Sequence, residues 1–212
     1  MQSRWVILDM MGVIFEVGDD TNDLLVPYVR RHDPSQSPER INALYLRASL
    51  GRISARQFWE ALGLGERYPG IERTYLDSQL RLDPGFREAA VLLSGPYRLA
   101  ILSNDVVEWS AYLRARHGLE DLFRASVISG EVHVRKPDKG IYEALLGRIG
   151  APPADCVLVD DRDKNLRPAA ELGMRTVRFA REAASGVFAA DAEIASFAEL
   201  PAAVQRVFAM PD

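Results

Sequence analysis

The sequence predicts an α/β fold, a Rossmann-like, doubly wound parallel sheet into which a helical segment is inserted. Three observations support this fold class. Short runs rich in Val, Ile and Leu alternate with longer amphipathic stretches, polar or glycine residues bound each apolar run, and one long stretch near the N-terminus breaks the alternation. Apolar runs that alternate with helical stretches are typical of repeated strand–helix–strand units, which form a parallel sheet.

Five short apolar segments are the predicted strands. They are Trp5–Leu8, Arg98–Leu102, Ala125–Ile128, Val157–Val159 and Thr176–Phe179. Near-continuous apolar strands of this kind suit a parallel sheet that is covered on both faces. Helices are predicted between them over Gly85–Leu93, Val106–His117, Lys139–Ile149 and Leu166–Leu172, and the Ala-rich tail from Glu182 to Asp212 is expected to close with a helix.

The long stretch after the first strand contains no convincing strand. Its amphipathic pieces are Asp20–Arg31, Pro38–Ser49 and Ser54–Leu62, and Ser54 with Gln57 forms a capping box at the start of the third. We therefore predict a helical cap domain over residues 18–83 and an α/β core domain over residues 1–17 and 84–212. Inserted helices that return to a sheet often form a lid over a site; the alternative is extra helices packed on one face of the sheet.

Composition excludes several classes of function. Hydrophobic residues make up 48% of the 212 residues and the formal net charge is −4, with Lys and Arg spread along the chain. This favours a folded protein without a nucleic-acid or membrane surface. The N-terminus enters a strand at once without a secretory cleavage pattern, and the single cysteine, Cys156, lies in an apolar run typical of a buried strand. We expect a cytoplasmic protein that is a monomer or a homodimer.

Polar residues follow four of the predicted strands. Asp9 follows the first, Ser103 and Asn104 follow the second, a loop ending in Lys136 follows the third, and Asp160 with Asp161 follows the fourth. Ligands of open α/β sheets bind beyond the carboxyl ends of the strands, so we expect these side chains to share one crevice.

The chemistry of this set favours a magnesium site and a phosphorylated substrate. The carboxylates of Asp9, Asp160 and Asp161 would repel one another unless a cation joins them. Oxygen ligands without matched His or Cys point to Mg²⁺ rather than zinc. A carboxylate held by Mg²⁺ beside Lys136 suits an electron-poor phosphorus centre. The Ser103 hydroxyl and the amide of Asn104 can then hold phosphoryl oxygens as charge develops, while an aspartate can act as a covalent nucleophile.

These residues resemble the four motifs of the haloacid dehalogenase superfamily, in order and spacing over nearly the whole predicted core. The runs are Val6–Phe15, Ala100–Asn104, Ser129–Asp138 and Val157–Met174. The resemblance implies a Mg²⁺-dependent hydrolase of a small phosphorylated metabolite that forms an aspartyl-phosphate. It implies catalytic roles for Asp9 and Lys136 and substrate binding by Ser103 and Asn104. It also implies metal ligation by Asp9, Met11 and Asp161, with Asp160 and Asn165 in support.

The inserted helices resemble the small helical cap of the family's first cap class. Gly51–Ser54 and Phe58 are similar to the branch that includes the N-terminal phosphatase domain of soluble epoxide hydrolase and related bacterial sugar-phosphate phosphatases. These cap residues assign no substrate.

One position departs from the family pattern. Superfamily phosphatases carry a second Asp two residues after the nucleophile, as proton donor and then base, and here that position is Met11. The backbone carbonyl of Met11 can still bind a metal, but its thioether cannot move a proton. Losing such a group typically costs about 10²–10⁴-fold in rate. Asp19, Asp20 and His32 are candidates for replacing it, although each also suits a helix start or a surface position.

Three interpretations of the site therefore remain open at the level of sequence. The first is a phosphatase of reduced or specialised activity whose proton relay is supplied by another group. The second is haloacid dehalogenase-type hydrolysis, in which halide leaves without a proton; the pair Asp160–Asp161 argues against it, because metal-free dehalogenases of the superfamily do not keep that pair. The third is a catalytically weak protein that binds a phosphorylated metabolite or a partner protein.

Overall fold

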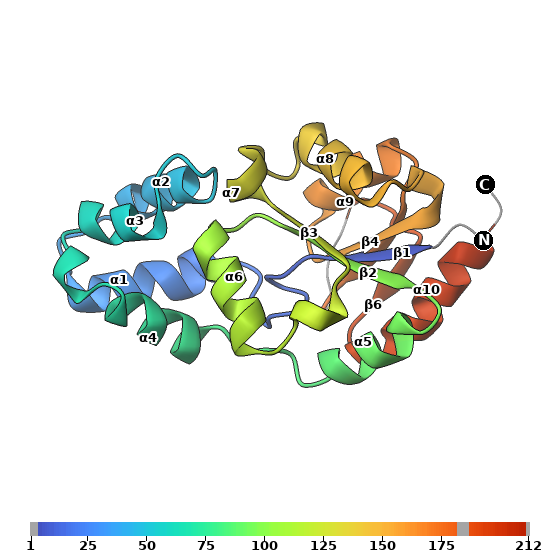
Figure 1. The fold of residues 1–212 in the computed structure, drawn as a ribbon, viewed down its shortest axis with the longest axis horizontal. Coiled ribbons are helices and arrows are strands. Elements are labelled where there is room, and N and C mark those ends of the chain that lie inside the picture. The colour runs from blue at the N-terminus through green and yellow to red at the C-terminus, as the bar shows by residue number, and fades with distance from the viewer. Residues whose placement is uncertain (1–3, 182–186, 211–212) are drawn as a thin grey trace.

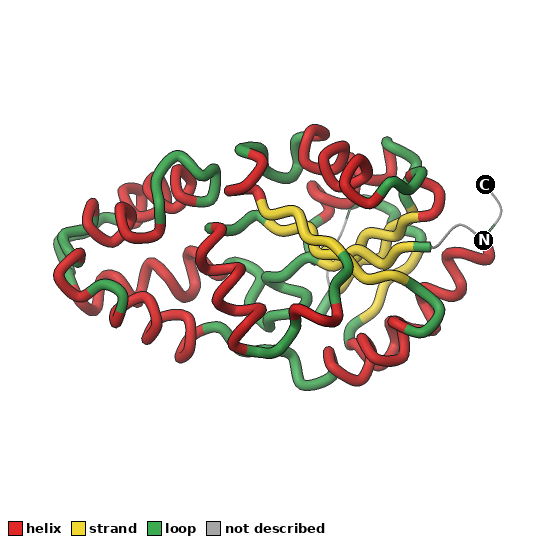
Figure 2. Tube along the Cα trace, in the orientation of Figure 1, coloured by secondary structure: helices red, strands yellow, loops and turns green. Residues whose placement is uncertain are grey.

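A computed structural model describes residues 4–181 and 187–210, so residues 182–186 and 211–212 of the predicted tail lie outside the described residues. Its centre is a six-stranded, fully parallel sheet in the order β3-β2-β1-β4-β5-β6 (Figures 1 and 2). The strands are β1 (Trp5–Leu8), β2 (Arg98–Ser103), β3 (Ala125–Ile128), β4 (Cys156–Asp160), β5 (Arg175–Phe179) and β6 (Ala192–Ile194). The predicted doubly wound α/β fold is confirmed, and Cys156 is a buried strand residue.

The five predicted strands are confirmed, and their ends differ from the prediction by at most one residue. The sixth, β6, was not predicted, because its three residues at the edge of the sheet form no apolar run. It is held by parallel pairing with β5 rather than by its own composition.

Helices cover both faces of the sheet. Figure 1 shows α8 and α9 on one side and α5 and α10 on the other. The core-side helices are α5 (Phe86–Ser94), α6 (Val107–Arg116), α7 (Ser129–Val132), α8 (Lys139–Ile149), α9 (Asp163–Glu171) and α10 (Leu200–Ala209). Trp5 and Ile7 of β1 pack into one apolar cluster, and Val6 and Leu8 pack into the other, as the alternation of a strand requires. The helix α9 begins three residues earlier than predicted, because its first turn is polar and lacks an apolar pattern.

The inserted segment is helical, as predicted, and lies at one end of the molecule (Figure 1). Its elements are η1 (Thr21–Leu25), α1 (Val26–His32), α2 (Pro38–Ala48), α3 (Ala55–Ala61), η2 (Gly65–Arg67) and α4 (Gly70–Gln79). The predicted capping box of Ser54 and Gln57 is present at the start of α3. The helix α4 was not predicted as a separate amphipathic segment. Single turns of 3₁₀-helix lie at η3 (Glu120–Leu122), η4 (Pro153–Asp155) and η5 (Phe197–Glu199).

The inserted helices pack tightly against the rest of the chain. Glu72 of α4 is buried, and its Oε2 accepts hydrogen bonds from the indole N–H of Trp59 in α3 at 2.9 Å and from that of Trp109 in α6 at 2.8 Å. Near α7, the Ser129 hydroxyl donates to the carbonyl of Ser49. One continuous apolar cluster joins the two regions. The division into a cap over residues 18–83 and a core over residues 1–17 and 84–212 therefore stays a prediction.

Among the described residues, no helix is both long enough and apolar enough to span a bilayer.

Substitution of Glu72 tests the hydrogen bonds that it accepts from the two indoles. We expect Glu72→Leu to lower the free energy of unfolding by about 2–6 kcal/mol, because each of two buried indole N–H groups then lacks an acceptor at about 1–3 kcal/mol apiece. Glu72→Gln keeps an acceptor oxygen and should lower the free energy of unfolding clearly less. Urea unfolding followed by tryptophan fluorescence measures both. Equal losses in the two variants would show that the hydrogen bonds to Glu72 do not stabilise this contact.

Candidate active site

Asp9, Ser103 and Asp160 lie at the carboxyl ends of three adjacent strands, and Lys136 joins them from the loop that follows α7. In the sheet, β1 lies between β2 and β4, and the chain order reverses at that point, which is where open α/β sheets bind ligands. The register sets Leu8 level with Ile101 on one side and with Val159 on the other. The residues that follow, Asp9 on β1 and Asp160 on β4, therefore emerge side by side.

Lys136 joins two of the carboxylates. Its Nζ lies 2.8 Å from Asp9 Oδ2 and 2.6 Å from Asp160 Oδ2, and its side chain is fully buried. Burial alone would lower the pKa of the ammonium group, but the charges of Asp160 and Asp9 outweigh burial and raise it. Lys136 therefore stays charged, and it fixes the position of the Asp9 carboxylate.

The Asp160 carboxylate is fully engaged by protein donors. Besides Lys136, it accepts hydrogen bonds from Asn165 Nδ2 at 2.9 and 3.1 Å and from the backbone N–H of Arg162 at 2.9 Å. The Asn165 backbone carbonyl in turn accepts a hydrogen bond from the Tyr142 hydroxyl. With both oxygens bonded, Asp160 orients Lys136 and has little capacity left for a metal.

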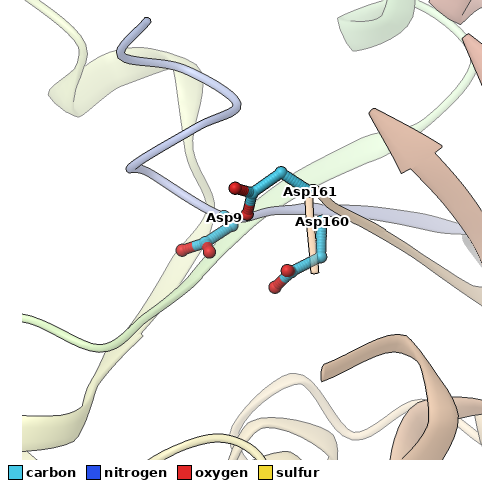
Figure 3. A group of neighbouring side chains, drawn as sticks. All are labelled: Asp9, Asp160 and Asp161. Carbon is cyan, nitrogen blue, oxygen red and sulfur yellow. The ribbon is translucent and has the colours of Figure 1, made fainter. Parts of the chain in front are cut away.

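Asp161, unlike Asp160, is not saturated with hydrogen bonds. Its Oδ1 is buried and has no hydrogen-bond partner among the described residues. Two glycines make room for the carboxylate: a Cβ added at Gly12 or at Gly18 would lie 2.4 Å from Asp161 Oδ2. Oxygen atoms of Asp9, Asp160 and Asp161 lie within 4.8 Å of one another, and Figure 3 shows the three side chains gathered at the strand ends.

The electrostatics of the cluster favour a bound cation. Burial raises the pKa of Asp9 to about 8, with further increases from Asp160 and Asp161 that the charge of Lys136 only partly offsets. Burial, together with the charge of Asp160, raises the pKa of Asp161 to about 6. A divalent cation between Asp9 and Asp161 would relieve this repulsion and give the orphaned Asp161 oxygen a partner. The residues present therefore fit a hard cation with oxygen ligands.

Met11 lies where its backbone can take part in such a site. Its side chain is buried and lines the cavity beside Asp9. The turn that follows is fixed by hydrogen bonds from Gly12 N to Phe15 O and from Phe15 N to Met10 O. The Met11 carbonyl oxygen accepts no hydrogen bond from the described part of the chain. Its predicted role as a ligand is compatible with this geometry and stays a prediction.

Ser103 and Asn104 have different surroundings. The Ser103 hydroxyl is buried without a partner among the described residues, although it lines the same cavity as Asp9. The Asn104 side chain is occupied: its Nδ2 donates to the Lys136 carbonyl at 2.9 Å, and its Oδ1 accepts from the Lys136 backbone N–H at 2.8 Å. That side chain therefore positions the lysine, and any contact of Asn104 with substrate is left to its backbone amide, as predicted from the motif.

A cavity of about 60 Å³ lies above Asp9. Besides the predicted residues Asp9, Met11, Ser103, Asn104 and Asn165, its walls include side chains that the sequence argument did not assign to the site, namely Thr21, Tyr45, Arg135 and Arg162. A larger, open hollow of about 620 Å³ lies beside Trp5 and Arg98 at the amino ends of the strands and contains none of the predicted site residues.

The two arginines give the cavity a positive wall. Arg135 donates to Ser49 Oγ, and its guanidinium lies 5.6 Å from the centre of the Tyr45 ring. Arg162 donates to the Gly18 carbonyl. In the sequence, Arg135 directly precedes Lys136 and Arg162 directly follows Asp161. These positions next to predicted site residues could have indicated that the two arginines belong to the site. Tyr45, whose hydroxyl donates to the Asn104 carbonyl at 3.3 Å, carried no such signal.

Comparison with known proteins agrees with this fold and identifies the family. The family model described as haloacid dehalogenase-like hydrolase matches residues 4–173. The chain therefore belongs to the haloacid dehalogenase-like hydrolases, and the family predicted from the four motifs is confirmed.

Its relatives include phosphatases. Over 115 residues the chain is 39% identical to glyceraldehyde 3-phosphate phosphatase of Methanopyrus kandleri, a match covering 54% of this chain and 43% of that protein. Over 141 residues it is 31% identical to phosphoserine phosphatase of Thermus thermophilus, covering 62% and 56%. The chain thus spans about half the length of these relatives. A phosphatase structure of the family from Thermococcus onnurineus matches with a TM-score of 0.72 at 23% identity, over 95% of this chain and 97% of that one.

Proposed function

We propose that the protein is a Mg²⁺-dependent hydrolase of small phosphorylated metabolites that acts through an aspartyl-phosphate on Asp9. The observation that carries the proposal is a pair of buried oxygens without a hydrogen-bond partner among the described residues: Ser103 Oγ, which shares a cavity with Asp9, and Asp161 Oδ1, which belongs to the acidic cluster around Asp9. The hydroxyl can donate to a phosphoryl oxygen, and the carboxylate can bind a cation. Phosphatases among the relatives support the same reaction class.

The proposed metal site consists of Asp9, the Met11 carbonyl and Asp161. When bound, Mg²⁺ would offset the negative charge of the carboxylates and of the incoming phosphoryl group. The charges support such an ion: Lys136 pairs with Asp9 and Asp160, whereas Asp161 has only Arg162, at 3.9 Å, as a charged partner among the described residues. A cation beside Asp161 would add to the positive charge that Arg135 and Arg162 offer to an anionic substrate.

The protein groups account for the other requirements of phosphoryl transfer. Lys136 holds the Asp9 carboxylate and can stabilise charge on the transferred group. Asp9 attacks phosphorus, the bond to the leaving oxygen breaks, and water then releases orthophosphate from the aspartyl-phosphate. A cavity of about 60 Å³ with arginines on its wall suits a small anion better than a bulky substrate.

Activity assays test the reaction class. We expect the wild type to release phosphate from p-nitrophenyl phosphate and acetyl phosphate only with Mg²⁺, and Asp9→Asn to lose this release because the nucleophile is gone. Release of halide from a 2-haloacid without metal would instead support dehalogenation. If neither activity depends on Asp9 while phosphorylated ligands still bind, the protein is a binding protein and the proposal is wrong.

Gly18→Ala tests the metal site through its shape. The added Cβ would displace the Asp161 carboxylate, and Gly18 does not require a left-handed backbone, so the fold should survive. We expect at least about tenfold weaker Mg²⁺ binding by calorimetry, in line with the effect of misplacing ligand shells. Gly147→Ala on α8, where an added Cβ meets nothing within 4 Å, is the matched control. Unchanged affinity in Gly18→Ala would place the ion elsewhere.

The pH dependence of Mg²⁺ affinity tests which groups bind the ion. Carboxylates bind Mg²⁺ when deprotonated, so protons compete below the raised pKa of Asp9, about 8, and that of Asp161, about 6. Affinity should therefore rise with pH and level off above about pH 8. Since ionisation changes tenfold for each pH unit below a pKa, we expect at least about tenfold weaker binding at pH 6 than at pH 8.5, with proton release. Constant affinity without proton release in two buffers would exclude these ligands.

A further inference from the structure

Three candidates could supply the proton that Met11 cannot, and the structure separates them. His32 is exposed at the end of α1, where its Nδ1 lies 3.0 Å from Arg67 Nη1. Asp19 is exposed, and both of its carboxylate oxygens bond to Asn22. Asp19 and Asp20 both line the cavity above Asp9, but Asp20 is only 8% exposed. No described side chain is hydrogen-bonded to its carboxyl group.

We propose that Asp20 is the proton donor and acceptor that replaces the carboxylate missing at position 11, an inference that rests on the phosphatase function proposed above. Asp20 immediately precedes η1 and lies in the inserted segment, whereas Asp9 lies at the end of β1. In phosphoryl transfer the leaving oxygen departs in line with, and opposite to, the attacking oxygen. Asp20 lines the same cavity as Asp9, so a group of the inserted segment borders the space that would hold the leaving oxygen.

The surroundings of Asp20 suit a group that exchanges protons near neutral pH. Burial raises the pKa of its carboxyl group to about 7, although the charge of Arg162 opposes the increase. A general acid and base works best when its pKa lies near the operating pH. The charged and titratable groups that face it come from several elements: Asp19, Tyr45, Tyr75, Asp105, Arg135 and Arg162. Burial and the charge of Asp19 favour the protonated acid, whereas Arg162 and Arg135 favour the carboxylate, so Asp20 can reach either protonation state.

The two half-reactions balance with Asp20 as the only proton carrier. In the first, Asp9 attacks phosphorus, the bond from phosphorus to the leaving oxygen breaks, and that oxygen takes the proton of Asp20. In the second, the Asp20 carboxylate takes a proton from water as the water oxygen attacks phosphorus. The bond from phosphorus to Asp9 breaks, orthophosphate leaves, and Asp20 is again protonated.

The experiment compares substrates that do and do not need a proton on the leaving group. We expect Asp20→Asn to lower turnover of glycerol 2-phosphate by about 10²–10⁴-fold, the usual contribution of a general acid and base. With p-nitrophenyl phosphate, whose leaving group departs unprotonated, the variant should give a burst of nitrophenolate equal to the enzyme concentration. Hydrolysis of the accumulated aspartyl-phosphate should then be slow. Asp23→Asn, an exposed carboxylate on η1, is the matched control.

A rescue experiment separates proton transfer from structural damage. If Asp20 does the work of the missing aspartate, Met11→Asp should restore glycerol 2-phosphate turnover in the Asp20→Asn background by at least about tenfold, part of the usual contribution. Full activity of Asp20→Asn would overturn the role of Asp20 and leave the proposed function standing. Loss of both the burst and turnover in Asp20→Asn, without rescue by Met11→Asp, would do the same. A wild type without Asp9-dependent phosphate release would overturn the proposed function together with it.

Discussion

The site depends on one buried ion pair network, in which the Lys136 ammonium lies between Asp9 and Asp160. Burying charges is costly unless each has a partner and its remaining hydrogen-bonding capacity is satisfied. Asp160 meets that condition through Asn165 and a backbone N–H, so it holds the lysine rigidly. Asp9 is then fixed by the lysine, while Asp161 is left with a free oxygen. The Asp160 carboxylate therefore positions Lys136, whereas the carboxylates of Asp9 and Asp161 remain able to react or to bind a metal.

The inserted helices complete the site from the opposite side. They bring Thr21 and Tyr45 to the cavity, and they are fastened to the rest of the chain near both α6 and α7. The arginines on the wall come from loops after β3 and β4 but contact the inserted segment at Ser49 and Gly18. The shape of the cavity is therefore set by both regions together, and the sequence of the helices alone does not define it.

How much could be predicted from sequence depends on whether a feature is local. The central strands of the sheet are apolar runs that can be recognised in the sequence. In a parallel sheet the residues that follow such strands gather at one edge, so the sequence could place Asp9, Ser103, Lys136 and Asp161 together. The strand β6 is short and relies on pairing with β5. Tyr45 reaches the cavity only through helix packing. Among the candidate proton carriers, burial distinguished Asp20 from its exposed neighbour, and burial depends on tertiary structure.

The pairing of β1 with its neighbours constrains the evolution of the chain. Leu8 is level with Val159, and Trp5 and Ile7 face one side of the sheet while Val6 and Leu8 face the other. Side chains alternate along a strand, so adding or deleting a single residue between Trp5 and Asp9 would exchange the two faces. It would also turn the Asp9 side chain away from Lys136. In descendants of this protein we expect the spacing within this first strand to tolerate no insertion or deletion.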